Sequence, residues 1–170
     1  MPLELPLEQM VRRRGQRDQL DFATEAMQRV PAGAEFVLKP SPRGVRLLGR
    51  DEAALQEPLR ALREKYGADL QIAPARARVL GSDPAQEPIM QVEITVGPGH
   101  ATRVRRALAR RGAKPLAESK GRLLFMRYAA PLADLLGLKD ELDRIAKGAA
   151  RHWMALSHYA HVKRRRHDLP

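Results

Sequence analysis

The stretch PIMQVEITVGPGHATRVRRALARR, residues 88–111, decides the fold of the second half of this chain. Every second residue from Met90 to Val96 is apolar, which is the period of a strand with one buried face. After the turn at Gly97–His100 the apolar residues recur at spacings of three and four, the period of a helix. We expect this helix to bury Ala101, Val104, Ala107 and Leu108.

The residues that follow complete a β-α-β-β-α-β order. Residues 113–131 are typical of two strands with a turn near Ser119–Gly121. Residues 131–148 are predicted to form one helix that ends at Gly148 and turns four side chains inward: Leu135, Leu138, Leu142 and Ile145. Residues 150–162 read as a last strand, whose alternation places His152, Met154, Leu156 and His158 on one face and Trp153, Ala155, Ser157 and Tyr159 on the other.

The first half shows the same order of elements. A short strand is expected at Leu3–Leu7, then a helix over residues 17–30 whose inner face is Leu20, Ala23, Met27 and Val30. Two strands at residues 35–40 and 44–50 surround the turn Pro40–Gly44, and residues 68–80 form the closing strand. The helix over residues 51–67 contains Pro58, which either kinks it or marks its first turn.

The sequence therefore predicts the α+β class. Two tandem ferredoxin-like (split β-α-β) domains are expected, each a four-stranded antiparallel sheet with two helices on one face. The first domain is placed at residues 1–80 and the second at residues 88–162. Residues 81–87, rich in turn-forming side chains, are the expected linker, and residues 163–170 a basic tail.

The charge is the strongest compositional signal. The formal net charge is +11, and residues 86–170 hold 17 Lys and Arg with 8 Asp and Glu, against 14 and 12 in residues 1–85. A positive field attracts polyanions, so nucleic acid is the expected partner class, with an anionic membrane surface as the alternative. With no cysteine, no signal-peptide pattern and no apolar run of membrane-spanning length, a soluble cytoplasmic protein is expected.

The helix after Gly99 carries arginines at positions 103, 106 and 110, a stripe opposite its apolar face. Residues 101–127 hold nine basic groups and one acid, Glu118, which predicts an uncompensated surface for a polyanion. A solvated arginine face in an arginine-rich proteome is the alternative. The predicted RNA-binding residues are Arg103, Arg105, Arg106, Arg110, Arg111, Lys114, Lys120, Arg122, Lys163, Arg164, Arg165 and Arg166.

Catalytic and metal sites are not expected. His158 and His161 are three residues apart, so in a strand they point to opposite faces and cannot share a metal ion. Ser157 would lie on the opposite face from His158 and so form no nucleophile–base pair with it. Gly97–His100 either cradles a phosphate at a helix N-terminus or is a simple turn. No cofactor is predicted.

Residues 87–162 resemble the last domain of translation elongation factor G and its relatives among the translational GTPases. The matching positions are Glu87, Pro88, Ile89 and Met90; Arg110, Arg111 and Gly112; Pro131, Leu132, Ala133 and Gly137; Leu142 and Gly148; and Met154, His158 and Tyr159. Residues 3–80 resemble the third domain more faintly, through Gly49, Glu52 and the segment LREKYGADLQIAPARARV. Ala149, where the family has arginine, and Pro58 depart from the pattern.

The resemblance implies docking on the ribosome, because these domains in the family lie against ribosomal RNA and protein. The chain has no Gly-x-x-x-x-Gly-Lys-Ser/Thr motif, so we expect no GTP hydrolysis. The expected function is non-enzymatic binding of the ribosome or structured RNA, with a ribosomal protein as a further partner. A protein-interaction or small-ligand regulatory module that homodimerises is the alternative, and the oligomeric state stays open.

Overall fold

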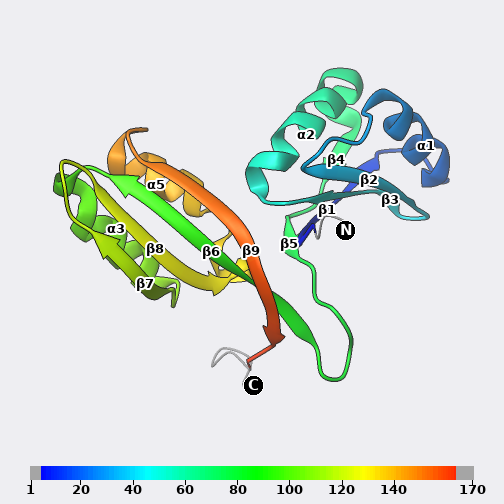
Figure 1. The fold of residues 1–170 in the computed structure, drawn as a ribbon. Helices are drawn as coiled ribbons and strands as arrows, with labels where there is room; N and C mark the ends of the chain where they lie inside the picture. The colour runs from blue at the N-terminus through cyan, green and yellow to red at the C-terminus, as the bar shows by residue number, and fades with distance from the viewer. Residues whose placement is uncertain (1–4, 164–170) are drawn as a thin grey trace. The chain divides into compact units, whose positions relative to one another are not determined.

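The computed structural model describes residues 5–163. The chain forms two compact units, Met1–Ala77 and Arg78–Pro170 (Figure 1), and each is described by itself.

The first unit is a sheet covered on one face by two helices. Its strands are ordered β2-β3-β1-β4, and the short β5 also pairs with β1. All of these pairings are antiparallel. The elements are β1 (Leu7–Arg13), α1 (Gln19–Arg29), β2 (Phe36–Ser41), β3 (Gly44–Gly49), α2 (Glu52–Tyr66), the 3-10 turn η1 (Gly67–Asp69), β4 (Leu70–Ile72) and β5 (Arg76–Ala77).

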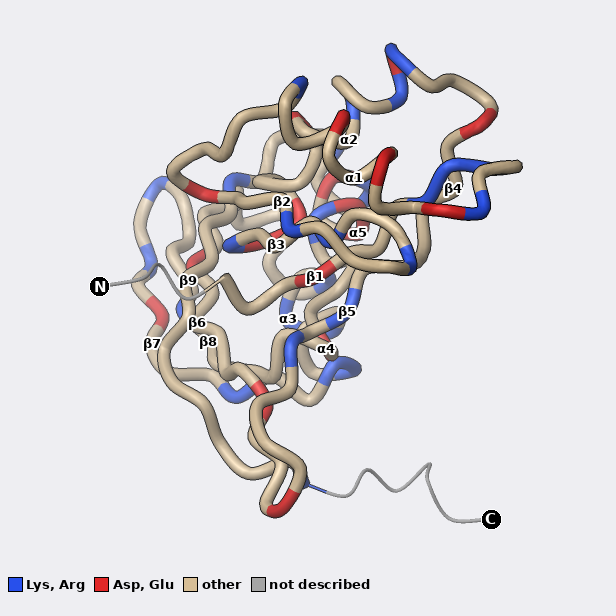
Figure 2. The backbone as a smooth tube through the Cα atoms, turned by 90° about the vertical axis from the view of Figure 1, so that its right-hand side faces the viewer, with Lys and Arg blue, Asp and Glu red and all other residues tan. Residues whose placement is uncertain are grey.

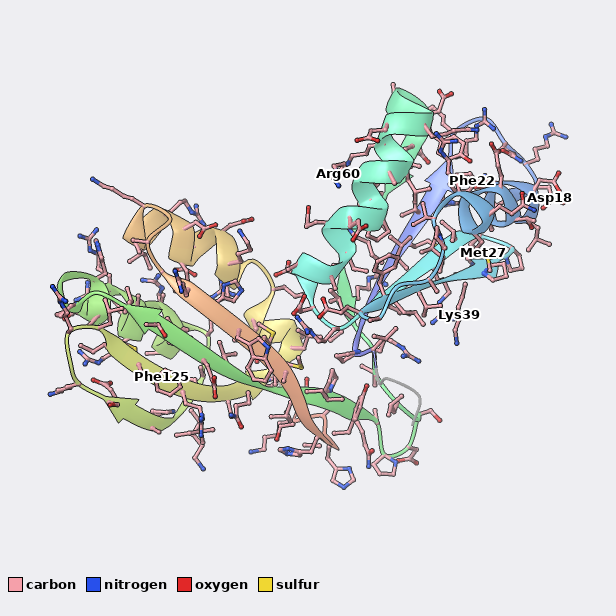
Figure 3. All side chains as sticks on the ribbon, turned by 45° about the horizontal axis from the view of Figure 1, so that its top comes forward. Asp18, Phe22, Met27, Lys39, Arg60 and Phe125 are labelled. Atoms are coloured by element: carbon pink, nitrogen blue, oxygen red, sulfur yellow. The ribbon has the colours of Figure 1, made fainter. Side chains whose placement is uncertain are left out.

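Apolar side chains from both layers form the core of this unit. Phe22 of α1, labelled in Figure 3, is fully buried. Its ring meets that of Tyr66 of α2 edge to face, with 5.1 Å between ring centroids. Gln19, a buried polar residue, accepts a hydrogen bond from the backbone N–H of Arg13 and donates one to its carbonyl. This side chain ties the end of β1 to the start of α1.

The second unit repeats the arrangement with longer strands. Its sheet has the order β7-β8-β6-β9, and all pairs are antiparallel. The elements are β6 (Gln86–Val96), the 3-10 turn η2 (Pro98–His100), α3 (Ala101–Arg110), β7 (Lys114–Ser119), β8 (Leu124–Pro131), α4 (Leu132–Leu135), α5 (Leu138–Ala146) and β9 (Arg151–His161). Gln86 and Glu87 belong to β6 and pair with β9.

The core of the second unit follows the sequence pattern closely. Every second residue of β6 from Met90 to Val96 is at most 1% exposed, as the alternation predicts. The four residues expected to form the inner face of α3 are its buried ones: Ala101, Val104, Ala107 and Leu108. The predicted fold class is confirmed in both units, because each sheet has the ferredoxin-like order with its helices on one face.

Three sequence predictions for the first unit are wrong. The first strand of the described residues is Leu7–Arg13 rather than Leu3–Leu7, of which residues 3 and 4 lie outside the described part. The predicted inner face of the first helix is right at Ala23 and Val30, which are buried, and wrong at Leu20 and Met27, which are exposed because Phe22 and Ala26 take the core positions of α1. The closing strand is divided into β4 and β5, with Pro74 between them.

Pro58 lies inside α2 without ending it. The helix begins six residues earlier, where the Asp51 side chain accepts a hydrogen bond from the N–H of Ala54 at 2.9 Å. Pro58 has no N–H to donate within the helix, and it is buried together with Leu55, Leu59 and Leu62 on the inner face of α2. Of the two alternatives for Pro58, the one in which it marks the first turn of the helix is therefore wrong.

Two more predictions fail in the second unit. The helix over residues 131–148 is divided into α4 and α5, since Gly137 takes a left-handed conformation with φ of 77°. In β9 the register shifts at Ser157, so that His158 pairs with Ile89 while Leu156 pairs with Met90. This bulge reverses the alternation, and His158 does not share the face of His152.

Candidate nucleic-acid interface

Helix α3 presents its arginines because its other side is buried. Arg103 and Arg106 are exposed, on the side away from the seam of Val104 and Leu108. Neither forms an ion pair with any carboxylate in residues 5–163. These two guanidinium groups are available to an external anion.

Arg105 is already paired within the second unit. Its Nε donates to Oε2 of Glu118 on β7 at 3.1 Å, and a second hydrogen bond joins the same two side chains. This hydrogen bonding is the main reason that the pKa of Glu118 lies below its ordinary value, and the charge of Lys120 acts in the same direction. The pair joins α3 to the edge strand of the sheet.

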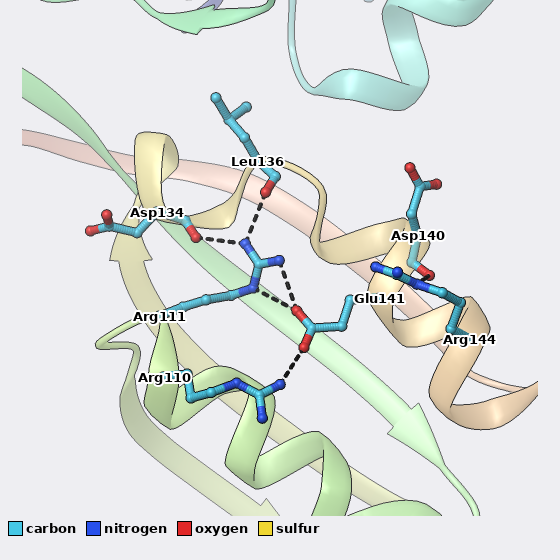
Figure 4. Close-up of polar contacts among 7 residues, drawn as sticks. All are labelled: Arg110, Arg111, Asp134, Leu136, Asp140, Glu141 and Arg144. Carbon is cyan, nitrogen blue, oxygen red and sulfur yellow. Dashed lines mark hydrogen bonds and ion pairs between the residues drawn. The ribbon is translucent and has the colours of Figure 1, made fainter.

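Arg110 and Arg111 share one carboxylate, that of Glu141 on α5 (Figure 4). Arg111 donates to Glu141 through Nε at 3.0 Å and Nη2 at 2.8 Å, and through Nη1 to the carbonyls of Asp134 and Leu136. The hydrogen bond from Arg111 is the largest cause of the lowered pKa of Glu141. Arg111 is therefore a link between α3, the α4–α5 turn and α5.

Of the predicted stripe, Arg110 has an ion pair while Arg103 and Arg106 have none among the described residues, and the neighbouring Arg105 and Arg111 are paired as well. The expectation of an uncompensated surface is therefore wrong in part. The sequence shows Glu118 nearby, but Glu141 lies 30 residues from Arg111 and reaches it only through the packing of α5 against α3. The basic residues without an ion pair in the described part of this region are Arg103, Arg106, Lys114, Lys120 and Arg122.

The hairpin of β7 and β8 carries the rest of this surface. Every residue of β7, including Lys114, is exposed, and so are Lys120 and Arg122 in the turn between β7 and β8. Because Glu118 pairs with Arg105, the hairpin end with Lys120 lies beside the N-terminal half of α3. We call Arg103, Arg106, Lys120 and Arg122 the basic ridge. Lys163 is exposed, and the predicted Arg164, Arg165 and Arg166 lie outside the described residues.

The face of the second sheet away from its helices carries aromatic side chains on β8 and β9. Trp153 on β9 is 48% exposed and pairs with Glu93 of β6. The guanidinium of Arg127 lies 5.7 Å from the ring centroid of Phe125 on β8, and the same arginine pairs with Glu93 at 2.8 Å (Figure 3). With that ion pair in place, the Arg127 charge is balanced, while Arg151 and Lys114 on the same face are exposed.

No group of three or more potential metal ligands occurs in the part of the chain that the structure describes. Ser157 Oγ lies 3.0 Å from Nδ1 of His158, so the expectation that these side chains are held apart on opposite faces is wrong. Both residues are exposed, and His158 contacts no carboxylate within residues 5–163. Pro98–His100 forms one 3-10 turn before α3.

The geometry defines a two-unit α+β protein whose most distinct surface feature is basic rather than catalytic. Lys and Arg occur along both units (Figure 2). No helix in the described residues is long and apolar enough to cross a membrane.

The comparisons with known proteins give the family. The family model described as Elongation factor G C-terminus matches residues 85–169, half of the chain, and the chain belongs to this family. The protein is therefore translation-factor-like, as the resemblance implies. The search of curated proteins found no match.

Among solved structures, a crystal structure of a protein from Thermus thermophilus is similar, with a TM-score of 0.63 and 15% sequence identity. The alignment covers 96% of this chain and 42% of that one. At this identity the likeness shows the fold alone. It extends over both units, including the first, which the family model does not match.

Proposed function

We propose that this translation-factor-like protein binds the ribosome or structured RNA through the basic ridge of its second unit, without catalysing a reaction. The observation that carries the proposal is that Arg103 and Arg106 on α3, and Lys120 and Arg122 in the β7–β8 turn, are exposed and have no ion pair among the described carboxylates. Four cations on one helix and its neighbouring hairpin repel one another, and a phosphate backbone relieves that repulsion.

Such contacts give affinity for shape and charge rather than for sequence. The apolar seam beneath α3 fixes the spacing of the arginines, so a duplex backbone meets a preformed surface. The ion pairs of Arg105 and Arg111 hold that helix against β7 and α5. In this proposal those two arginines position the ridge and do not contact RNA.

The alternative of a module that dimerises through its sheets has less support. The exposed edge strand β7 carries Pro115, an adjacent lysine and a register shift between Pro115 and Ala117. Proline, lysine and bulges are the features by which sheet edges resist pairing with another chain. Sedimentation of the purified chain tests this alternative.

The test of RNA binding is filter binding of an RNA hairpin across a salt series, comparing two matched double variants. Arg103→Gln with Arg106→Gln removes two exposed arginines, three residues apart, from α3. Arg60→Gln with Arg63→Gln removes the same pattern from α2 of the first unit, where both are exposed (Figure 3 labels Arg60).

We expect the α3 variant to reduce the slope of log K against log salt by about 1.4 to 1.8, since each lost phosphate contact removes roughly 0.7 to 0.9. The α2 variant should keep the slope. In co-sedimentation with ribosomal subunits, the α3 variant should likewise bind more weakly than the α2 variant. Absence of binding at low salt, or equal slopes for the two variants, would refute the proposal.

A further inference from the structure

A groove on the first unit is lined by four arginines that come from separate strands and a turn. Its volume is about 370 Å³, and its basic residues are Arg12 on β1, Arg43 in the β2–β3 turn, Arg46 on β3 and Arg76 on β5. The sequence gives no hint of this group, because its members are spread over more than sixty positions. Only the sheet brings them together.

The strand register explains how. Glu8, Met10 and Arg12 alternate with the buried Leu7 and Val11, so they lie on the face of β1 away from the helices. Across the sheet, Arg46 is the partner of Met10 on β3, and Arg76 is the partner of Glu8 on β5. The three strands therefore present these side chains on one face.

Gly44 brings the fourth arginine into place. Its φ of 139° is accessible to glycine, and a Cβ at this position would collide with the carbonyl oxygen of Val11 and lie 3.1 Å from Cγ of Arg12. The absent side chain lets the β2–β3 turn approach β1 closely. Arg43, the residue before Gly44, consequently reaches the same groove as Arg12.

The charges in the groove are unbalanced. Glu8 is its one acidic lining residue and pairs with Arg46, with 2.7 Å between Oε2 and Nη2. Arg12, Arg43 and Arg76 form no ion pair with any carboxylate of residues 5–163, which leaves a surplus of three positive charges. The planar guanidinium group suits phosphate, which it binds through two parallel hydrogen bonds.

We propose that this groove binds the phosphate of a nucleotide, either free or within an RNA chain. Its volume falls at the lower end of the range for small-ligand sites, roughly 300 to 1,000 Å³. Met10 and Pro74 add apolar lining against which a ribose or base can pack. This site is separate from the proposed function, since it uses no residue of the basic ridge.

The test uses the full chain carrying Arg103→Gln and Arg106→Gln, so that the basic ridge contributes as little as possible to the measured phosphate binding. Amide ¹H–¹⁵N NMR spectra are recorded during titration with sodium pyrophosphate, with ATP and with a single-stranded RNA hexamer. We expect shifts concentrated in β1, the Arg43 turn and β5. Adding Arg12→Gln and Arg43→Gln should weaken binding about tenfold or more, whereas Arg60→Gln and Arg63→Gln should leave it unchanged.

The three probes separate the sources of the phosphate. ATP binding as tightly as the hexamer identifies a free nucleotide, and a hexamer preferred by about tenfold or more identifies an RNA chain. The site is refuted if no probe causes localised shifts at about 10 mM, or if the groove variant binds as well as the α2 control. The two tests are independent: the filter-binding salt series can refute RNA binding by the basic ridge while the groove still binds phosphate, and the NMR titration can refute the groove while the ridge still binds RNA.

Discussion

Arg111 is predicted to stabilise the second unit although it lies in the region expected to bind RNA. Its guanidinium donates two hydrogen bonds to the Glu141 carboxylate and two to the backbone carbonyls of Asp134 and Leu136, and the side chain is 21% exposed. Arg111→Ala removes all four at once. Arg110→Ala is the matched control, because Arg110 contacts the same carboxylate with one hydrogen bond and is 61% exposed.

A hydrogen bond to a charged group contributes about 1.5 to 3 kcal/mol, and bonds that share partners are not additive. We therefore expect Arg111→Ala to lower the free energy of unfolding of this unit by about 2 to 4 kcal/mol. Arg110→Ala should cost less than about 1 kcal/mol, as exposed ion pairs do. The difference is large against the few kcal/mol of stability that a small domain has.

The assay is urea denaturation followed by tryptophan fluorescence. Trp153 is the only tryptophan of the chain and lies on β9, so the signal reports the second unit alone. With a slope of about 1 to 2 kcal/mol/M, the Arg111→Ala midpoint should fall by roughly 1 to 4 M. If its midpoint matches that of Arg110→Ala, Arg111 is not a structural link and the division of α3 into positioning and RNA-contacting arginines is wrong.

Three further predictions concern acid stability, a turn and a helix cap. The pKa of Glu141 in the folded protein lies below its ordinary value of 4.5, so the stabilisation by this carboxylate is present above pH 4.5 and is lost as the pH falls through the folded-state pKa. In Glu141→Gln, the urea midpoint should therefore fall less steeply than in the unmodified protein as the pH is lowered below 4.5. Gly44→Ala should destabilise the first unit by about 1 to 3 kcal/mol, measured by circular dichroism, through its positive φ and the clash with Val11. Asp51→Ala should cost about 1 kcal/mol in the same measurement, and an unchanged midpoint would show that the N-cap bond to Ala54 contributes nothing.

The sequence by itself determined the order of elements and the inner faces of most of them. In β6 and α3 the apolar period is regular, and the buried residues are those that the pattern gives. The pattern failed where a single residue changes the local geometry. Gly137 divides the last helix, and the bulge at Ser157 reverses a strand face. A period cannot show such changes because it assumes regular backbone on both sides.

The sequence predicted the position of the basic ridge but not which of its arginines form ion pairs. Clustered arginines indicate a positive surface, but whether each is free depends on carboxylates elsewhere in the chain. Glu141 neutralises part of the charge of Arg110 and Arg111 because α5 packs against α3. The four-arginine groove of the first unit is the opposite case, since its members come from three regions of the sequence around Arg12, Arg43–Arg46 and Arg76 that only the sheet brings together.

What the sequence determined alone is therefore what short-range periodicity encodes: strands, helices, their buried faces and the total charge of each half. The tertiary structure alone decided which charges meet. The ion pairs of Arg111 with Glu141 and of Arg46 with Glu8 join side chains 30 and 38 positions apart, and only the packing of strands and helices brings such side chains within a few ångströms of one another.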